Sequence, residues 1–307
     1  MPRAVVLCCL LLSAATSLPT AAWARDCIGM VTAGSTAFWA EMEAGARQAA
    51  EELELDLYVR GPTHEGSAEV QLQLIERVLA KGCRALVIAP AGDAIAARVA
   101  ALRAAGIATV YVDRDVAGEG VYALVATDNF LAGQLAGQRL AELLAGRGRV
   151  ALLRLRQDLQ STGERERGFL LAAEAAGLQV VFAEYLGDDR QAISGALRER
   201  LPRLDGLFTP NGTSTRATLA ALRQLGRVGQ VPHVGFDGGS LLLDALRQGQ
   251  IHALLQQQPQ AMGYRAVRLA QQALRGEPAA SRLQLLLEPR VLTAAELVDG
   301  DVAEQPW

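Results

Sequence analysis

Short apolar stretches alternate with amphipathic stretches along nearly the whole chain from Ile28 onward. The apolar stretches have the length of strands, and the longer stretches between them carry apolar residues at helical spacing. This alternation restricts the fold more than any other feature, because parallel strands need crossover helices that pack on both faces of their sheet. The sequence therefore predicts the α/β class with parallel sheets.

The alternation runs through two consecutive halves that repeat in pattern but not in residues. No low-complexity linker separates them, so we expect two compact lobes with a cleft between them, beyond the carboxyl ends of the strands, where open α/β sheets bind ligands. In the first half we predict strands at residues 28–33, 55–60, 84–90, 107–113 and 121–127, and helices at 38–53, 67–81 and 93–105. In the second half we predict strands at 149–155, 179–185, 206–210, 233–236 and 250–256, and helices at 129–144, 163–176, 190–201, 213–225, 240–248 and 259–274.

The first 24 residues have the pattern of a secretory signal peptide. Arg3 supplies a positive charge, residues 4–12 form an apolar run too short to span a bilayer, and Ala22-Trp23-Ala24 is a small-residue cleavage site. We therefore expect residues 1–24 to be removed and the mature protein to be exported to the periplasm. The remainder is long enough for two domains of ordinary size.

Charge and motif content exclude several classes of protein. The formal net charge is −3 and no basic stripe stands out, so nucleic acid is not an expected partner. No segment after the signal approaches the roughly 18 consecutive apolar residues of a membrane helix, which predicts a soluble mature chain. The three histidines are scattered, and no G-x-S-x-G, H-E-x-x-H or P-loop motif occurs, so we expect no catalytic residue, no metal and no cofactor.

Polar and aromatic residues stand where the predicted strands end. The motifs are Phe38-Trp39, Asp113-Arg114, Ala126-Thr127-Asp128-Asn129, Glu164-Arg165-Glu166-Arg167-Gly168-Phe169, Asn211, Val234-Gly235-Phe236-Asp237-Gly238, and Gln257 followed by Pro259. Their order and spacing resemble those of the type I periplasmic sugar-binding proteins, the ribose/galactose-binding family. Each motif is weak by itself, but their shared order behind a signal peptide is specific. The resemblance covers nearly the whole mature chain.

The resemblance implies two Rossmann-like lobes with parallel sheets, joined by three crossovers. One lobe would hold residues 25–127 and 258–287, and the other would hold residues 128–257 and 288–307. The crossovers would fall near Asp128, Gln257 and Glu288.

Two cysteines, Cys27 and Cys83, remain once the signal peptide is removed. In an oxidising compartment an isolated pair often forms a disulfide, and the alternative is two buried thiols. In the topology that the resemblance implies, the first and third strands are neighbours and each begins near one of these cysteines. The resemblance therefore favours a bridge between them.

The resemblance also implies a sugar site in the cleft, and the residue types suit one. Carboxylates accept from two hydroxyls, guanidinium groups donate through a fixed fork, amides do both, and aromatic rings lie against the C–H face of a sugar ring. Two aspartates against two arginines suit a neutral ligand. The expected ligand contacts are Thr36, Phe38, Trp39, Asp113, Arg114, Arg165, Asp188, Asn211, Asp237 and Gln257.

Several of these residues have a structural alternative. Only one of Phe38 and Trp39 is expected in the cleft, because adjacent helical residues cannot both face one core. The alternative for Asp113-Arg114 is a surface ion pair, and the alternative for Asn211-Gly212 is a simple turn. Arg167 competes with Arg165 for the role of ligand contact. The contact assigned to Gln257 shifts to Gln256 or Gln258 if the register slips by one residue.

Three positions depart from the family pattern. Thr36 stands where ribose-type proteins usually have asparagine, and Gly212 replaces the aspartate that usually follows the binding asparagine. Asp188 falls where the second lobe often supplies an aromatic ring, so it would either make the site more negative or be a solvated helix cap. The ligand class therefore stays open between an aldose, a polyol and a ligand that bears an amine.

The leading hypothesis is a periplasmic solute receptor, expected to be a monomer, that closes its lobes on a sugar-like ligand and delivers it to the permease of an ABC importer. The alternative is the same fold acting as a ligand sensor for a chemoreceptor or a membrane sensor kinase. A LacI-type repressor shares the binding core, but the first predicted strand starts too soon after the signal for a DNA-binding helix-turn-helix. A glycosidase would use paired carboxylates, which here are matched by arginines.

Overall fold

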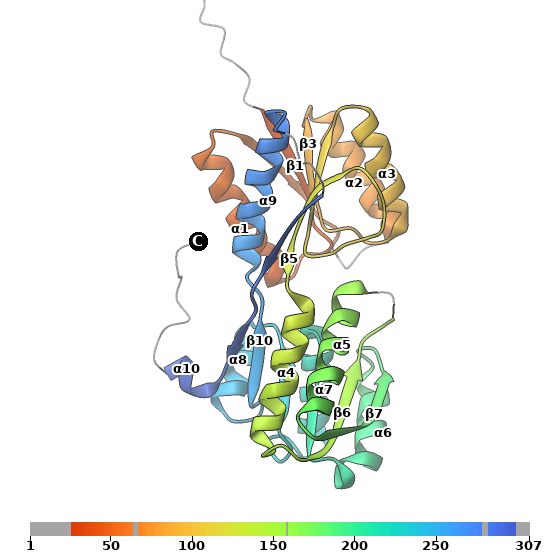
Figure 1. Ribbon diagram of the computed structural model, residues 1–307, viewed down its shortest axis with the longest axis vertical. Helices are drawn as coiled ribbons and strands as arrows, with labels where there is room; N and C mark the ends of the chain where they lie inside the picture. The colour runs from red at the N-terminus through yellow and green to blue at the C-terminus, as the bar shows by residue number, and fades with distance from the viewer. Residues whose placement is uncertain (1–25, 64–66, 158, 278–281, 299–307) are drawn as a thin grey trace, which may run out of the picture.

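The computed structural model describes residues 26–63, 67–157, 159–277 and 282–298, and the predicted signal peptide at residues 1–24 lies outside them. The described residues form two lobes, each built around a six-stranded sheet with helices on both faces (Figure 1). This is the predicted α/β class. No helix in these residues is long and apolar enough to cross a membrane.

The first lobe combines the N-terminal part of the chain with one helix and one strand from its C-terminal part. Its strands are β1 (Cys27–Val31), β2 (Asp56–Arg60), β3 (Ala85–Ile88), β4 (Ala108–Val112), β5 (Val121–Thr127) and β11 (Leu283–Leu287), and its helices are α1 (Ala37–Glu52), α2 (Ala68–Ala80), α3 (Asp93–Ala104) and α9 (Pro259–Leu274). The sheet is wholly parallel, in the order β11-β5-β4-β3-β1-β2. Helices α1 and α9 cover one face, and α2 and α3 cover the other.

The second lobe repeats this plan with one reversed edge strand. Its strands are β6 (Gly148–Arg154), β7 (Leu178–Tyr185), β8 (Gly206–Phe208), β9 (His233–Phe236), β10 (Ala253–Gln256) and β12 (Arg290–Leu292), and its helices are α4 (Asn129–Leu143), α5 (Gln160–Ala175), α6 (Arg190–Arg200), α7 (Gly212–Gln224), α8 (Ser240–Arg247) and α10 (Ala294–Val298). The order is β12-β10-β9-β8-β6-β7, and β12 runs antiparallel to β10. Helices α4 and α5 cover one face, and α6 and α7 cover the other.

Burial on both faces explains why the strands read as continuous apolar runs. In β3, Val87 packs in the cluster beneath α1 and α9, whereas Leu86 and Ile88 pack in the cluster beneath α2 and α3. Successive side chains of a strand point to opposite faces, so both must be apolar when helices cover both faces.

The chain passes between the lobes three times, and hydrogen bonds tie the three crossovers together. The hydroxyl of Thr127 donates to Oε1 of Gln257 at 2.8 Å, and the N–H of Asp128 donates to the carbonyl of Leu287 at 2.9 Å. Nε2 of Gln258 donates to the carbonyl of Glu288 at 2.7 Å. The strand ends of the two lobes therefore face each other across a bonded junction.

Every strand and helix predicted from the sequence is present, and many of the ends are displaced by one to three residues. Helix α5 begins at Gln160 instead of residue 163, and β10 begins at Ala253 instead of residue 250. No element is predicted from the sequence after residue 274, yet β11, β12 and α10 lie there. These elements are short, and the two strands pair with segments far away in the chain, so no long periodic pattern reveals them.

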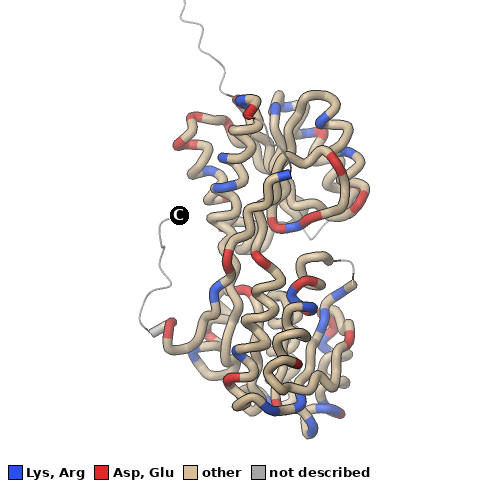
Figure 2. Tube along the Cα trace, viewed as in Figure 1, with Lys and Arg blue, Asp and Glu red and all other residues tan. Residues whose placement is uncertain are grey.

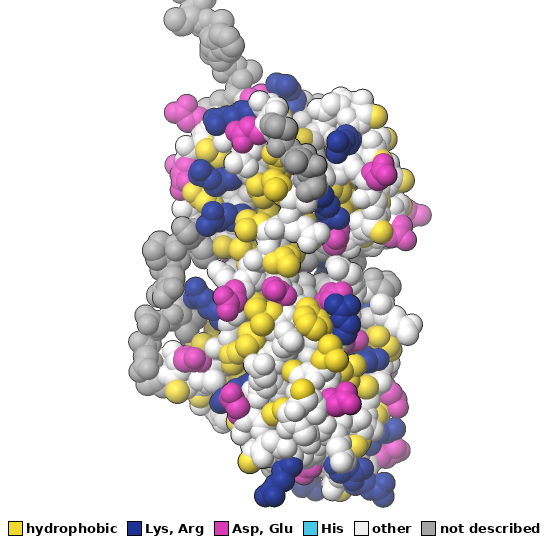
Figure 3. All heavy atoms as spheres, in the orientation of Figure 1, with side chains coloured by type: hydrophobic (Ala, Val, Ile, Leu, Met, Phe, Trp, Pro, Cys, Tyr) yellow, Lys and Arg dark blue, Asp and Glu magenta, His cyan; other side chains and the backbone are white. Residues whose placement is uncertain are grey.

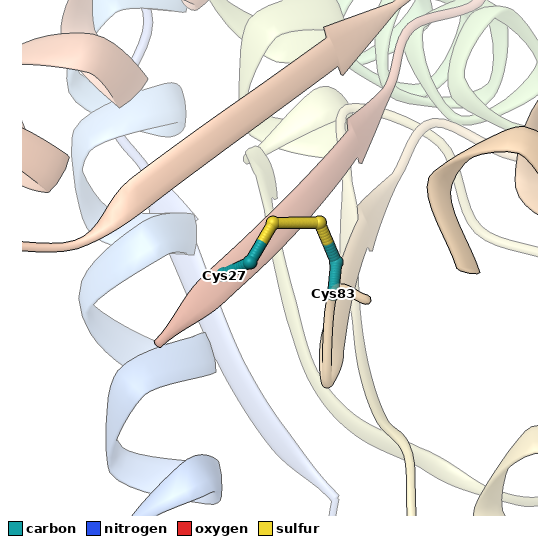
Figure 4. Close-up of a disulfide and its surroundings, with 2 residues drawn as sticks. All are labelled: Cys27 and Cys83. Atoms are coloured by element: carbon teal, nitrogen blue, oxygen red, sulfur yellow. A yellow bond between two sulfur atoms is a disulfide. The ribbon is translucent and has the colours of Figure 1, made fainter. Parts of the chain in front are cut away.

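A disulfide joins Cys27, at the start of β1, to Cys83, which precedes β3 (Figure 4). The two Cα atoms are 4.3 Å apart, and the two strands are neighbours in the sheet. The N–H of Arg84 donates to the carbonyl of Cys27 beside the bridge, at 2.9 Å. The covalent bond closes a long loop, which reduces the entropy of the unfolded chain.

Candidate functional site

Each lobe ends one central strand in an aspartate with an unusual backbone. Asp113 follows β4 and Asp237 follows β9, and both have a φ angle of 64°. This left-handed conformation is uncommon for residues other than glycine, although aspartate adopts it more readily than most. Each aspartate N–H donates at 2.8 Å to the next strand, to the carbonyl of Val125 or of Leu255. Backbone of this kind concentrates at binding sites, and here it recurs at corresponding points of two lobes.

Two donors from different elements hold the carboxylate of Asp237. Its Oδ1 accepts from Nε2 of Gln257 at 2.7 Å, and its Oδ2 accepts from the N–H of Gly212 at 2.9 Å. Gly212 begins α7, and a Cβ there would lie 2.8 Å from that Oδ2. Because Gly212 has no side chain, it admits the carboxylate to the start of a helix, where negative charge is stabilised.

Arg165 on α5 is buried, with 3% of its surface exposed. Its Nε donates to Oδ1 of Asn129 at 2.8 Å, and its Nη1 and Nη2 donate to the carbonyl of Pro210 and to Oε1 of Gln257, both at 3.0 Å. The guanidinium carbon also lies 3.8 Å from the centre of the Phe236 ring, within cation–π distance. These contacts fix the orientation of the guanidinium fork.

Charges from both lobes act on Arg165. Burial lowers the pKa of its guanidinium, the nearby carboxylates of Asp237 and Asp113 raise it, and Arg114 lowers it. Asp113 and Arg114 belong to the first lobe, so carboxylates and guanidinium groups of both lobes form one electrostatic cluster. Figure 2 shows acidic and basic residues on both sides of the junction between the lobes.

Aromatic side chains adjoin the first-lobe part of this cluster. The rings of Phe38 and Trp39 meet edge to face, with centroids 5.0 Å apart. Trp39 is buried in the core beneath α1 and α9, while Phe38 is half-buried against that core. The guanidinium of Arg114 lies 5.7 Å from the Trp39 ring, and its Nε is 3.7 Å from Oδ2 of Asp113. Phe38 is therefore the ring with exposed surface.

Three further predicted contacts lie near helix starts. Asn211 is the N-cap of α7, and its Oδ1 accepts from the N–H of Ser214 at 2.8 Å, so its amide nitrogen is the group it can offer to a ligand. Thr36 is the exposed N-cap residue of α1. Asp188 is exposed in the turn before α6, where no hydrogen bond of the described residues joins it to the cluster. Its alternative role as a helix cap is wrong, because Asp189 caps α6.

The cluster contains residues that were not predicted as ligand contacts. Thr127 donates to Gln257, and Asn129 accepts from Arg165. Both belong to the motif Ala126-Thr127-Asp128-Asn129, so the sequence indicated their positions. No motif in the sequence indicated Glu41. It lies on the first-lobe helix α1, and burial, followed by the charge of second-lobe Asp237, raises the pKa of its carboxyl.

The lobes lie close together at the rim of the junction. Figure 3 shows them in contact over the crossovers, with charged side chains nearby. A cavity of about 40 Å³ lies between the loops after β3 and β4 and the start of α5, lined by Arg114 and Ser161 among others. This space is too small for a sugar. A larger cavity of about 490 Å³, lined by Arg103, Glu119 and Arg282, lies elsewhere on the first lobe.

The sequence of this chain is similar to the sequences of known binding proteins. The profile of the periplasmic binding protein domain matches residues 28–278. The ribose import binding protein RbsB of Haemophilus influenzae is 27% identical over 277 residues, which cover 89% of this chain and 94% of that protein. The D-ribose/D-allose-binding protein of Pseudomonas aeruginosa is 28% identical, over 72% of this chain and 73% of that protein.

Solved structures agree in fold. The periplasmic component of an ABC-type sugar transport system from Hahella chejuensis is 36% identical, with a TM-score of 0.77, and the match covers 87% of this chain and 99% of that one. A solute-binding protein of an ABC transporter from Agrobacterium vitis, bound with α-D-tagatopyranose, is 25% identical, with a TM-score of 0.83, over 91% of this chain and 98% of that one.

Proposed function

The chain belongs to the periplasmic binding protein family, and on that premise we propose that it captures a sugar or sugar-like ligand between its lobes and delivers it to an ABC importer. The family consists of binding proteins, and we accordingly propose a receptor without catalytic activity. The proposed ligand contacts are Thr36, Phe38, Asp113, Arg114, Arg165, Asp188, Asn211, Asp237 and Gln257. Trp39, buried in the core, supports Phe38 from below instead of facing the ligand.

The proposal rests above all on the cluster of opposite charges from both lobes around Arg165. A buried guanidinium is costly unless its donors are bonded and its charge is balanced. Here three hydrogen bonds satisfy the donors of Arg165, and the charges of two carboxylates partly offset its burial. A ligand hydroxyl can donate to an aspartate while it accepts from an arginine. Because the two lobes each supply such groups, a ligand gains its full set of contacts only when both lobes face it, and binding then favours closure.

The charges also bear on the class of ligand. Asp113 and Asp237 balance Arg114 and Arg165, which suits a neutral aldose or polyol. Glu41 adds negative charge beside Asp237. This supports an amino sugar as the second candidate ligand.

The family membership and the signal pattern support a periplasmic location for the mature chain. As lobe boundaries we propose residues 25–127 with 258–287, and 128–257 with 288–307, so that each lobe keeps its own sheet. We propose a monomer that binds no nucleic acid, since the net charge is close to zero.

The function is tested by a thermal-shift panel of D-ribose, D-allose, D-arabinose, D-tagatose, myo-inositol and D-glucosamine. A ligand present at 100 times its Kd stabilises the folded state by about 2.7 kcal/mol. We expect at least one member of the panel to raise the melting temperature, and calorimetry then gives its Kd. A flat response to every member would contradict a sugar receptor.

The site is tested with Asp237→Asn, because asparagine tolerates the left-handed backbone of this position. Loss of the carboxylate is expected to weaken binding by at least about tenfold, or 1.4 kcal/mol. The matched control is Asp244→Asn on α8, where an exposed carboxylate pairs with Arg247 at 2.8 Å, away from the cluster. Unchanged affinity in Asp237→Asn would show that the site assignment is wrong.

A further inference from the structure

A series of polar side chains lies buried behind the second-lobe part of the candidate site. Thr209 follows β8, Thr215 lies in the first turn of α7, and His233 begins β9. All three are 0% exposed. Hydroxyl and imidazole groups cost free energy in such surroundings unless they are hydrogen-bonded, so the bonds they make are informative.

The three side chains are bonded in sequence and end on the backbone. Nε2 of His233 lies 2.8 Å from Oγ1 of Thr209, which lies 2.9 Å from Oγ1 of Thr215. The hydroxyl of Thr215 donates to the carbonyl of Asn211 at 2.7 Å and accepts from the N–H of Phe236 at 3.0 Å. We call His233, Thr209 and Thr215 the buried relay.

The two backbone groups belong to the elements that carry the proposed ligand contacts. Asn211 is one of those contacts, and Phe236 immediately precedes Asp237 while its ring lies beside Arg165. The Thr215 hydroxyl therefore joins the start of α7 to the end of β9. Among the described residues, one other hydrogen bond joins the start of α7 to the end of β9. It runs from Gly212 N–H to the Asp237 carboxylate, and a ligand hydroxyl would contact the same carboxylate.

Counting protons fixes the direction of each bond in the relay. The carbonyl of Asn211 can only accept, so the single hydroxyl proton of Thr215 is used there. Thr209 must then donate its proton to Thr215 and accept from His233. His233 therefore carries a proton on Nε2, as in one of its two neutral tautomers.

The surroundings of His233 agree with this tautomer. Its Nδ1 is buried and has no hydrogen-bond partner among the described residues, so a proton on that nitrogen would be an unsatisfied donor. Burial, and then the proximity of His252, lower the pKa of His233 to about 3. The ring is accordingly uncharged at neutral pH.

We propose that Thr215 is a positioning residue that holds Asn211 and Asp237 in the geometry a ligand requires, with Thr209 and His233 fixing the orientation of its hydroxyl. The proposal rests on the proposed function, since it concerns the same site. Thr215 acts through the backbone of Asn211 and Phe236.

Three substitutions separate positioning from packing. Thr215→Val preserves the shape and removes the hydroxyl, and Thr215→Ser keeps the hydroxyl. Thr218→Val removes a buried hydroxyl of the same helix that has no hydrogen-bond partner among the described residues. In calorimetric titrations with D-ribose, D-allose and D-arabinose, we expect binding at least about tenfold weaker in Thr215→Val, within about threefold of wild type in Thr215→Ser, and unchanged in Thr218→Val. Wild-type affinity in Thr215→Val, or an equal loss in Thr218→Val, would overturn the proposal.

A measurement without ligand distinguishes failure of this proposal from failure of the proposed function. In nitrogen-15 NMR spectra we expect His233 with a protonated Nε2 and a bare Nδ1. The resonances of the Asn211 side-chain amide and the Asp237 backbone should move in Thr215→Val and return in Thr215→Ser. A proton on Nδ1, or unmoved resonances, would overturn the proposal even if sugars bind. If the wild type binds no sugar, the proposed function fails, and the same resonances still decide whether Thr215 positions these residues.

Discussion

The two lobes share one backbone plan, down to the points where their helices touch. In the first lobe, a Cβ on Gly45 of α1 would overlap the carbonyl oxygen of Gln260 on α9, and a Cβ on Gly263 of α9 would overlap that of Met42 on α1. The corresponding second-lobe pairs are Gly168 with Phe130 and Gly133 with Arg165. Helix α1 therefore corresponds to α5, and α9 corresponds to α4.

In this correspondence Met42 and Arg165 occupy the same place. Both are buried, but Met42 packs in the apolar core of its lobe, whereas Arg165 bonds to three oxygens beside a charged cluster. The shared backbone fixes where the side chain starts. The chemical type of the side chain then decides whether the position adds to the apolar core or to the charged cluster.

The starts of the strands show a second difference. In the first lobe Cys27 and Cys83 are bridged beside the bond from Arg84 N–H to the Cys27 carbonyl. In the second lobe the matching backbone bond runs from Asp205 N–H to the Arg149 carbonyl, and the Asp205 carboxylate accepts from Arg149 N–H at 2.7 Å. At this point the first lobe has a disulfide bond, whereas the second lobe has a hydrogen bond to the Asp205 carboxylate.

The largest expected effect tests the shared helix contacts. Gly45→Val and Gly168→Val should each destabilise the protein by about 4 kcal/mol or more, because the added atoms meet backbone that cannot move aside. Urea unfolding followed by circular dichroism measures both. Gly195→Ala on α6 is the control, since a Cβ there meets nothing within 4 Å, and it should stabilise by about 0.5–1 kcal/mol. If only one of the two valine variants lost much stability, the helix contacts of the two lobes would not be equivalent.

A smaller effect is expected from the strand starts. Replacing Cys27 and Cys83 together by serine should cost about 2–4 kcal/mol and remove any response of stability to reductant. Asp205→Asn should cost about 1 kcal/mol, because it weakens one charge-assisted hydrogen bond near the surface. Thermal unfolding with and without dithiothreitol compares the two. Equal costs would show that the bridge contributes no more than the carboxylate.

The smallest effect concerns Glu41, a carboxylate of the first lobe whose charge interacts with that of Asp237 in the second lobe. Burial and Asp237 raise the pKa of Glu41 above its ordinary value of 4.5, so ionisation of Glu41 opposes folding. Its unfavourable contribution is absent below the ordinary pKa, develops as pH rises from there to the raised pKa of the folded state, and is complete above it. Glu41→Gln should therefore be slightly more stable than wild type at pH 7 and equal to it in acid, as thermal unfolding across pH would show.

The control for that change is the corresponding second-lobe residue. Glu164 pairs with Arg167 at 2.5 Å, so Glu164→Gln should bring no gain in stability at pH 7. A gain of equal size in both variants would mean that the effect does not depend on Asp237.

The site residues that could be predicted from the sequence are those that follow predicted strands or lie in the first turns of the helices after them. The structure brings Asp113, Arg114, Arg165, Asp237 and Gln257 into one cluster, and each belongs to a motif visible in the chain. Glu41 was missed because nothing in the sequence distinguishes it from the other carboxylates of α1. The late strands β11 and β12 escaped because their partners are distant in sequence.

The sequence by itself determined the α/β class, the two repeated halves and the order of strand-end residues, because periodicity and strand ends are local properties of the chain. Only the tertiary structure decided that Gly212 admits the Asp237 carboxylate, that Glu41 of one lobe acts on Asp237 of the other, and that Thr215 joins α7 to β9. These contacts join residues from separate elements, and their distances depend on how helices and sheets pack, which no local pattern encodes.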